Sequence, residues 1–204
     1  MKLPRRPTAP RPIGLSAAPL LALCLAACGG GGSDATGTIG PIAAGGTTPA
    51  PTSTSTAGST CNIPDFAATA LARVNQLRAA GADCRSGGTF APAAALTWSA
   101  LLTRAAETHT QDMAAKNFFS HTGSSGSTLA DRVGATGYAW SSLGENIAAG
   151  YAGIDKVVDG WIASDGHCAN LMNPGFNQAG MVCVPGDTAS SYRTYWTLDL
   201  ARSR

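Results

Sequence analysis

Residues 61–204 are predicted to form an α+β domain, because helical and strand patterns coexist there without repeated strand–helix–strand units. Apolar residues recur at helical spacing in three segments, at about 66–80, 99–116 and 154–162. Residues 192–200 instead place tyrosine, threonine, tryptophan and leucine at every second position, which indicates a strand with one buried face. These roughly 144 residues are enough for one domain with one core.

The amino-terminal residues 1–27 are predicted to be a secretory signal. They contain four basic residues, no acidic residue and an apolar run that is too short to span a bilayer. The run ends as Leu25-Ala26-Ala27-Cys28, which resembles the lipobox of bacterial lipoproteins. That resemblance implies that Cys28 is acylated and that its acyl chains hold the protein in a membrane. An ordinary signal followed by a chance cysteine is the alternative.

Residues 28–60 are predicted to be a disordered tether, because they are mostly Gly, Ser, Thr, Pro and Ala with a single charge at Asp34. The whole chain carries a formal charge of +2, and removing the four positive charges of the signal leaves about −2. No cluster of Lys or Arg remains in residues 28–204, so nucleic-acid binding is not expected. The signal predicts export, and the lipobox resemblance implies a protein of the bacterial envelope.

The first two helices of the domain have recognisable ends. Asp65 can cap the first helix and Gly81 can end it. The second helix carries His109 on its apolar stripe, where a histidine is more often a buried, hydrogen-bonded side chain than a ligand. After this helix, Thr128 and Asp131 fit a capping box for a short helix at 129–136.

Three polar segments between these elements are the candidate site. His121 precedes a loop rich in glycine and serine, and Glu145 lies in a segment bracketed by Gly144 and Gly150 that is expected to be extended. Glu145 is expected to line a cleft, although it can instead bond backbone amides or an arginine such as Arg132. The helix at 154–162 is expected to present Ser164 in its last turn, with His167 in the loop that follows.

Four cysteines remain after export, Cys61, Cys84, Cys168 and Cys183, and an even number in an oxidising compartment predicts two disulfides. Three pairings are possible. We expect the local one, Cys61 with Cys84 and Cys168 with Cys183. A zinc site is the rival interpretation, but no CxxC or CxxH spacing favours it.

Five motifs in order carry a resemblance to a known family. They are Phe118–His121, Gly144–Ile147, Trp161 with Ser164, His167 and Asn170, then Gly180, and Tyr195–Thr197. Together they resemble the bacterial branch of the CAP superfamily, also called SCP or TAPS proteins. The resemblance implies a three-layer α-β-α sandwich with a central antiparallel sheet.

The resemblance also implies roles for single residues. The four cavity residues of the family, two histidines and two acidic residues, map onto His121, Glu145, Ser164 and His167. Animal and plant members have glutamate where this chain has Ser164, so the cleft has lost one carboxylate. Asn75, Arg78, Asn146 and Asn170 are expected to be structural residues that hold helices and loops together.

A metal site in such a cleft would be open. His121 and His167 would bind Zn²⁺ or a similar divalent cation weakly, and Glu145 would orient a histidine or a water molecule. No cofactor is expected to be required. In a Gram-negative host, Gly29 after Cys28 would direct the lipoprotein to the outer membrane.

These features leave three hypotheses for function. We favour a lipid-anchored envelope protein that binds a small or lipidic ligand, or a partner, in its cleft without catalysis. The second is a metal-assisted hydrolase in which His121 and His167 hold the ion and Glu145 is the base. No GxSxG or HExxH motif favours it. The third is a structural or adhesive envelope protein.

Overall fold

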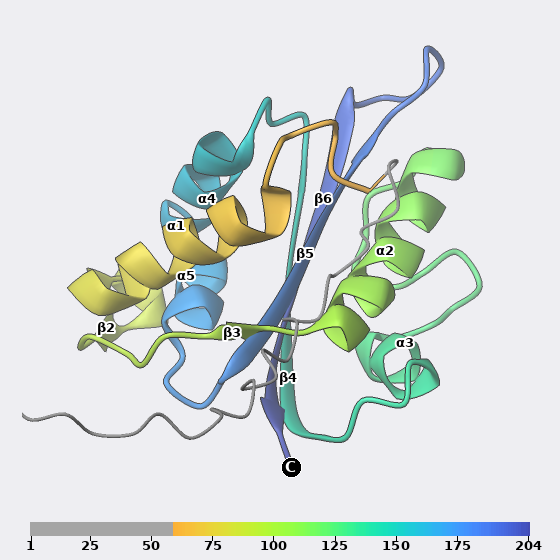
Figure 1. Cartoon of the computed structure of the whole chain (residues 1–204). Coiled ribbons are helices and arrows are strands. Elements are labelled where there is room, and N and C mark those ends of the chain that lie inside the picture. The colour runs from red at the N-terminus through yellow and green to blue at the C-terminus, as the bar shows by residue number, and fades with distance from the viewer. Residues whose placement is uncertain (1–58) are drawn as a thin grey trace, which may run out of the picture. The chain divides into compact units, whose positions relative to one another are not determined.

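The computed structural model describes residues 59–204, and every structural statement below refers to that range (Figure 1). The predicted signal, Cys28 and almost all of the predicted tether lie outside the described residues. The elements are α1 (Phe66–Ala80), β1 (Ala82–Asp83), the 3₁₀ turn η1 (Arg85–Gly87), β2 (Thr89–Phe90), β3 (Thr97–Trp98), α2 (Ala100–Ala115), α3 (Leu129–Ala135), β4 (Trp140–Ala149), α4 (Ile154–Ile162), α5 (Asp165–Met172), β5 (Gln178–Pro185) and β6 (Thr194–Ser203).

The central sheet has four strands in the order β3-β5-β6-β4. The three long strands are antiparallel, with Glu145 of β4 opposite Asp199 of β6 and Gly180 of β5 also opposite Asp199. The short β3 pairs with β5 in parallel, which the sequence did not indicate. The α+β class is confirmed.

Helices cover both faces of this sheet and make three layers (Figure 1). On one face, α1, α4 and α5 bury the largest cluster of apolar side chains, which includes Trp196, Leu198 and Leu200 of β6. On the other face, α2 and α3 pack against the alternate residues, such as Tyr195 and Ala201. Both faces of β6 are therefore buried, because its two sets of alternating side chains meet different helices.

Of the two predicted helix caps, the structure confirms one. The Ser99 side chain accepts from the Leu102 amide at the start of α2, and Thr128 and Asp131 form the expected capping box of α3. The Asp65 prediction is wrong, because Asp65 has a left-handed backbone instead of the extended one typical of a capping residue, and its side chain bonds no amide of α1. Within residues 59–204, no helix is long and apolar enough to cross a membrane.

The disulfide prediction is also wrong: the structure joins Cys61 to Cys183 and Cys84 to Cys168, and so excludes the local pairs Cys61–Cys84 and Cys168–Cys183. The helix α1, which is about 22 Å long, lies between Cys61 and Cys84 in the chain. Ser59 and Thr60, at the end of the predicted tether, pair with β5 and bring Cys61 beside Cys183. Each bridge thus links segments that the fold, rather than the sequence, makes neighbours.

Two predicted structural residues fasten α1 to the rest of the domain. The Asn75 side chain accepts from the Leu96 amide at 2.8 Å and donates to the Leu96 carbonyl at 3.0 Å. Arg78 is completely buried and donates to four backbone carbonyls, those of Ala94, Leu171, Asn173 and Phe176. Such contacts hold α1 against the segment before β3 and against the end of α5 and the turn that follows it.

Candidate functional site

Glu145 is the centre of the polar part of the site. It lies in the middle of β4, and its side chain is only 3% exposed. Its Oε1 accepts from Nδ1 of His121 at 2.8 Å, and its Oε2 accepts from Nη2 of Arg132 at 2.6 Å. The alternative expectation for Glu145, a bond to Arg132, is therefore confirmed, and its other oxygen bonds to His121.

The Glu145 carboxyl is ionised at neutral pH. Burial raises its pKa, but the hydrogen bond from His121 and the positive charge of Arg132 outweigh burial and bring the pKa below its usual range. An ionised carboxylate only accepts hydrogen bonds, so Nδ1 of His121 must carry a proton. In the neutral imidazole this leaves Nε2 of His121 free to accept, on a side chain that is 57% exposed.

Arg132 joins the His121 loop to the sheet. Its guanidinium donates to the carbonyls of His121 and Ser127 as well as to Glu145, and its side chain is only 3% exposed. It projects from α3, so the capping box at the start of that helix helps to place it. The position of His121 therefore depends on a buried arginine that is eleven residues further along the chain.

Ser164 and His167 lie at the start of α5, one turn apart. The expectation that His167 follows in a loop is wrong, because Asp165–Met172 form a helix of which His167 is the third residue. Ser164 is the residue before the helix, and its side chain caps no amide. Burial, followed by the nearby charge of His121, lowers the pKa of His167, so this half-buried imidazole is neutral at neutral pH.

Asn146 and Asn170 connect α5 to β4. The Asn146 side chain donates to the carbonyl of His167 at 3.0 Å. Asn170 donates to the Asn146 side chain and to the carbonyl of Glu145. These bonds fix the distance between the strand that carries Glu145 and the helix that carries His167.

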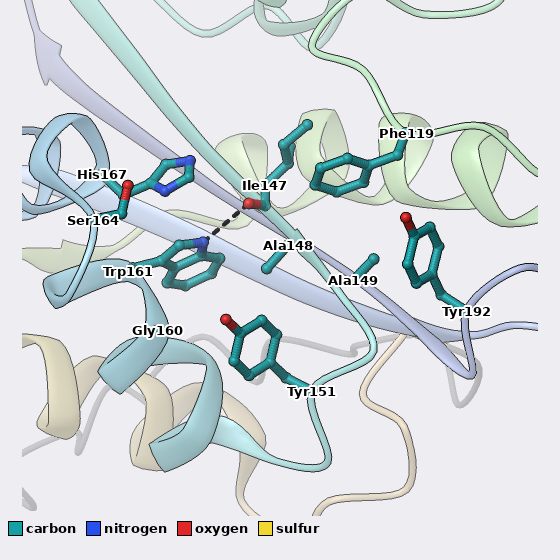
Figure 2. A pocket seen from close by; sticks show the side chains of 10 residues that line it. All are labelled: Phe119, Ile147, Ala148, Ala149, Tyr151, Gly160, Trp161, Ser164, His167 and Tyr192. Carbon is teal, nitrogen blue, oxygen red and sulfur yellow. Dashed lines mark hydrogen bonds between the residues drawn. The ribbon is translucent and has the colours of Figure 1, made fainter.

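A pocket of about 310 Å³ opens beside His167. Figure 2 shows Trp161 and Tyr151 on one side of Ala148 and Ala149, Phe119 and Tyr192 on the other, and His167 with Ser164 at one end. Phe119, Tyr151 and Tyr192 are the exposed large apolar side chains of the described residues. All three therefore line one pocket.

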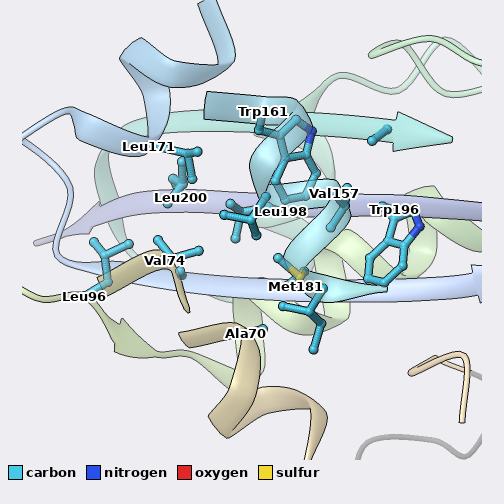
Figure 3. Close-up of a cluster of buried hydrophobic side chains, with 14 of the residues drawn as sticks. Ala70, Val74, Leu96, Val157, Trp161, Leu171, Met181, Trp196, Leu198 and Leu200 are labelled. Carbon is cyan, nitrogen blue, oxygen red and sulfur yellow. The ribbon is translucent and has the colours of Figure 1, made fainter. Parts of the chain in front are cut away.

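The walls of the pocket are fixed by contacts with the core. The indole of Trp161 donates to the carbonyl of Ile147 at 3.1 Å, and its ring belongs to the main apolar cluster (Figure 3). The carbonyl of Tyr151 accepts from the indole of Trp196 and from the hydroxyl of Thr194. Gly160 leaves room for the Tyr151 ring, which any Cβ at that position would overlap.

Sequence patterns did not identify Tyr151 and Tyr192 as site residues. They lie 41 positions apart and line the same pocket only because β4 and β6 are neighbours in the sheet. The available signal was an aromatic residue directly after Gly150 and another just before the final strand. Neither signal indicates a pocket without the strand pairing.

The donor set does not fit a resident metal ion. Zinc sites in proteins use three or four histidine, cysteine or carboxylate groups. Among residues 59–204 no three such groups are placed to hold an ion together. Both oxygens of Glu145 are already engaged by His121 and Arg132, so the two imidazoles would bind a cation alone.

Comparison with known proteins identifies relatives of the domain. The model of the cysteine-rich secretory protein family, CAP, matches residues 71–200. The uncharacterized protein YkwD of Bacillus subtilis is 35% identical over 80 residues, which cover 39% of this chain and 31% of the relative. The uncharacterized membrane protein YlbC of the same organism is 33% identical over 88 residues, which cover 43% and 25%.

A solved structure is also similar to this chain. It is the crystal structure of an extracellular protein containing an SCP domain from Bacillus anthracis. It has 26% identity and a TM-score of 0.52, over 69% of this chain and 44% of that protein. This chain thus spans less than half the length of each of the three relatives.

Proposed function

The chain belongs to the cysteine-rich secretory protein (CAP) family, and we propose that it is an exported, lipid-anchored envelope protein. We further propose that it binds a compact ligand beside His167 without covalent chemistry. The ligand is a small molecule or a short apolar portion of a lipid. The membrane is reached through acyl chains on Cys28. The extracellular SCP-domain relative supports export.

The pocket is the observation that carries this proposal. Large apolar side chains that gather at one exposed place mark an interaction site more often than scattered ones do. Its volume of about 310 Å³ lies at the lower end of the range for small-molecule sites, so it suits a ring or a short chain. Aromatic walls would contact the apolar body of such a ligand, and His167 and Ser164 would bond its polar end.

Nothing in the geometry favours the metal-assisted hydrolase. A general base must lie within hydrogen-bond reach of the proton that it removes, directly or through one water molecule. Glu145 is buried and each of its oxygens already accepts a hydrogen bond, from His121 or from Arg132. Its carboxylate is suited to orient His121 and not to activate a water molecule.

Recovery of the ligand tests the proposal. The protein is purified from its own envelope with Ala149→Phe, which fills the pocket, and with Ala79→Phe, which adds the same ring to an exposed position of α1. Mass spectrometry of solvent extracts should find a molecule with the wild type and Ala79→Phe that is missing from Ala149→Phe. Identical extracts from all three proteins would refute binding in this pocket.

A further inference from the structure

Asp199 is a buried carboxyl group to which the proposed function gives no role. It lies in the middle of β6, between Glu145 of β4 and Gly180 of β5 in the strand register. On the same face of β6, the Thr197 hydroxyl accepts from the Thr110 hydroxyl of α2 at 2.8 Å. The side chain of Asp199 therefore faces the α2 side of the sheet, as Glu145 does.

Gly180 lets α2 pack close enough to the sheet to bury Asp199. The backbone of α2 lies so close to β5 that a Cβ at Gly180 would be 2.7 Å from the carbonyl carbon of Leu102. Asp199 is completely buried beneath this contact. Neither of its carboxyl oxygens accepts a hydrogen bond from any of residues 59–204. An ionised carboxylate in this place would lose its hydration without compensation.

The ionisable groups around Asp199 and Glu145 come from each element that packs there. They are Arg132 of α3, His109 of α2 and His121 of the loop between them, while β5 presents only Gly180. Arg132 donates to Glu145 and to two loop carbonyls, and His109 donates its Nε2 hydrogen to the carbonyl of Ser120. No cation therefore donates to Asp199.

We propose that Asp199 keeps its proton at neutral pH and uses it to hydrogen-bond to Glu145, so that the acidic group of the cleft is a carboxyl pair with one negative charge. Glu145 and Asp199 lie directly opposite each other in the register of β4 and β6, and two carboxyl groups so placed hold one proton between them, because two negative charges would repel. A protonated Asp199 supplies the donor for this bond, since ionised Glu145 can only accept.

The proton lies on Asp199 for two reasons. Burial, and then the charge of Glu145 and a hydrogen bond to it, raise the pKa of Asp199 far above the usual aspartate range. Glu145 instead has two donors, His121 and Arg132, that stabilise its charged form. The two carboxyl groups are thus assigned opposite states by their different partners.

Asp199 is therefore a positioning residue, which acts on His121 through Glu145. His121 and Arg132 each donate to one oxygen of Glu145, and Asp199 adds a third donor to the same carboxylate. The carboxylate then holds Nδ1 of His121 and leaves Nε2 free on an exposed side chain. This assignment stands or falls independently of any ligand in the pocket.

Two substitutions separate the proton from the shape. Asp199→Asn keeps an N–H donor toward Glu145, whereas Asp199→Leu has a similar size and no donor; Asp155→Asn on the exposed side of α4 is the control. Nitrogen NMR of the imidazoles should show His121 with its proton on Nδ1 in the wild type and in Asp199→Asn. In Asp199→Leu it should show a mixture of tautomers. The same tautomer in all variants would overturn the positioning role.

The proton itself is tested by pH and by infrared spectroscopy on the full chain in its exported form. Above about pH 4, the unfolding constant of the wild type relative to Asp199→Asn should rise up to tenfold per pH unit, because unfolding releases the Asp199 proton. The wild type at neutral pH should also show the carbonyl band of a protonated carboxyl group. A wild type without that band, or a ratio that does not change with pH, would overturn the proposal.

Discussion

Nη2 of Arg132 donates to Oε2 of Glu145 at 2.6 Å, and each side chain is almost completely buried. A buried ion pair contributes little when it replaces a well-packed apolar pair, but removal of one partner leaves an uncompensated charge. We therefore expect Arg132→Ala to lower the free energy of unfolding by about 3–5 kcal/mol. Urea denaturation of the purified protein measures this.

Arg104→Ala is the matched control, because it removes the same charge from an exposed position of α2. It should change the free energy of unfolding by less than about 0.5 kcal/mol. Equal losses in the two variants would mean that the Arg132–Glu145 pair contributes no more than any surface arginine.

The disulfides predict a second measurable effect. Peptide mapping without reduction should give one fragment that joins Cys61 to Cys183 and another that joins Cys84 to Cys168. The bridges close segments of 122 and 84 residues, so replacement of either pair by alanine should cost about 4–5 kcal/mol by the loop-closure estimate. A fragment that joins Cys61 to Cys84 would contradict the fold of the amino-terminal segment.

Local sequence patterns do not determine the pairing of the cysteines or the conformation of the segment that carries His167. Apolar periodicity predicted the helices and the final strand, since burial of one stripe is a local property of the chain. The pairing of Cys61 with Cys183 depends on contacts between distant segments, and so does the helix that carries His167. Asp165-Gly166 directly after Ser164 indicated that the helix ends there, so His167 was expected in a loop.

The strand β6 shows the same limit for the site. Its alternation revealed the face of Trp196, Leu198 and Leu200 but left Thr197 and Asp199 without a role. The apolar stripe of the helix at 99–116 must pack against a second face of the sheet. Because Asp199 lies on that face, the stripe was the sequence feature that indicated its burial. The candidate residues His121, Glu145, Ser164 and His167 were proposed by resemblance, and two of them, Ser164 and His167, line the pocket. The aromatic walls and Asp199 required the tertiary structure.

The lipid anchor makes a prediction outside the described residues. Cys28→Ser should leave the signal uncleaved by the lipoprotein peptidase and move the protein out of the detergent phase, because it removes the acylation site. Cys24→Ser, within the same predicted signal, should leave the partition unchanged. If Cys28→Ser partitions like the wild type, Cys28 is not the anchor.

Zinc binding should be weak and should need both cleft imidazoles. Calorimetric titration should detect no binding to His121→Ala or to His167→Ala, whereas His109→Ala should bind as the wild type does. Neutral imidazole is the ligand, and burial lowers the pKa of His167. Its contribution should therefore persist below pH 6.5, the ordinary value for histidine. Zinc binding that is lost only in His109→Ala would show that the assignment to His121 and His167 is wrong.

His109 should make the fold sensitive to acid. Burial lowers the pKa of His109, and Arg132 lowers it further, while the charge of Glu145 opposes both. The unfolded chain therefore takes up this proton first as pH falls below about 6.5, and the stability from neutral His109 is lost as pH falls through the lower folded pKa.

His109→Gln can still donate to the Ser120 carbonyl and cannot titrate. Urea unfolding between about pH 5 and 7.5 should show the wild type losing up to about 1.4 kcal/mol per pH unit relative to His109→Gln. Parallel losses in the two proteins would show that His109 is not the group responsible.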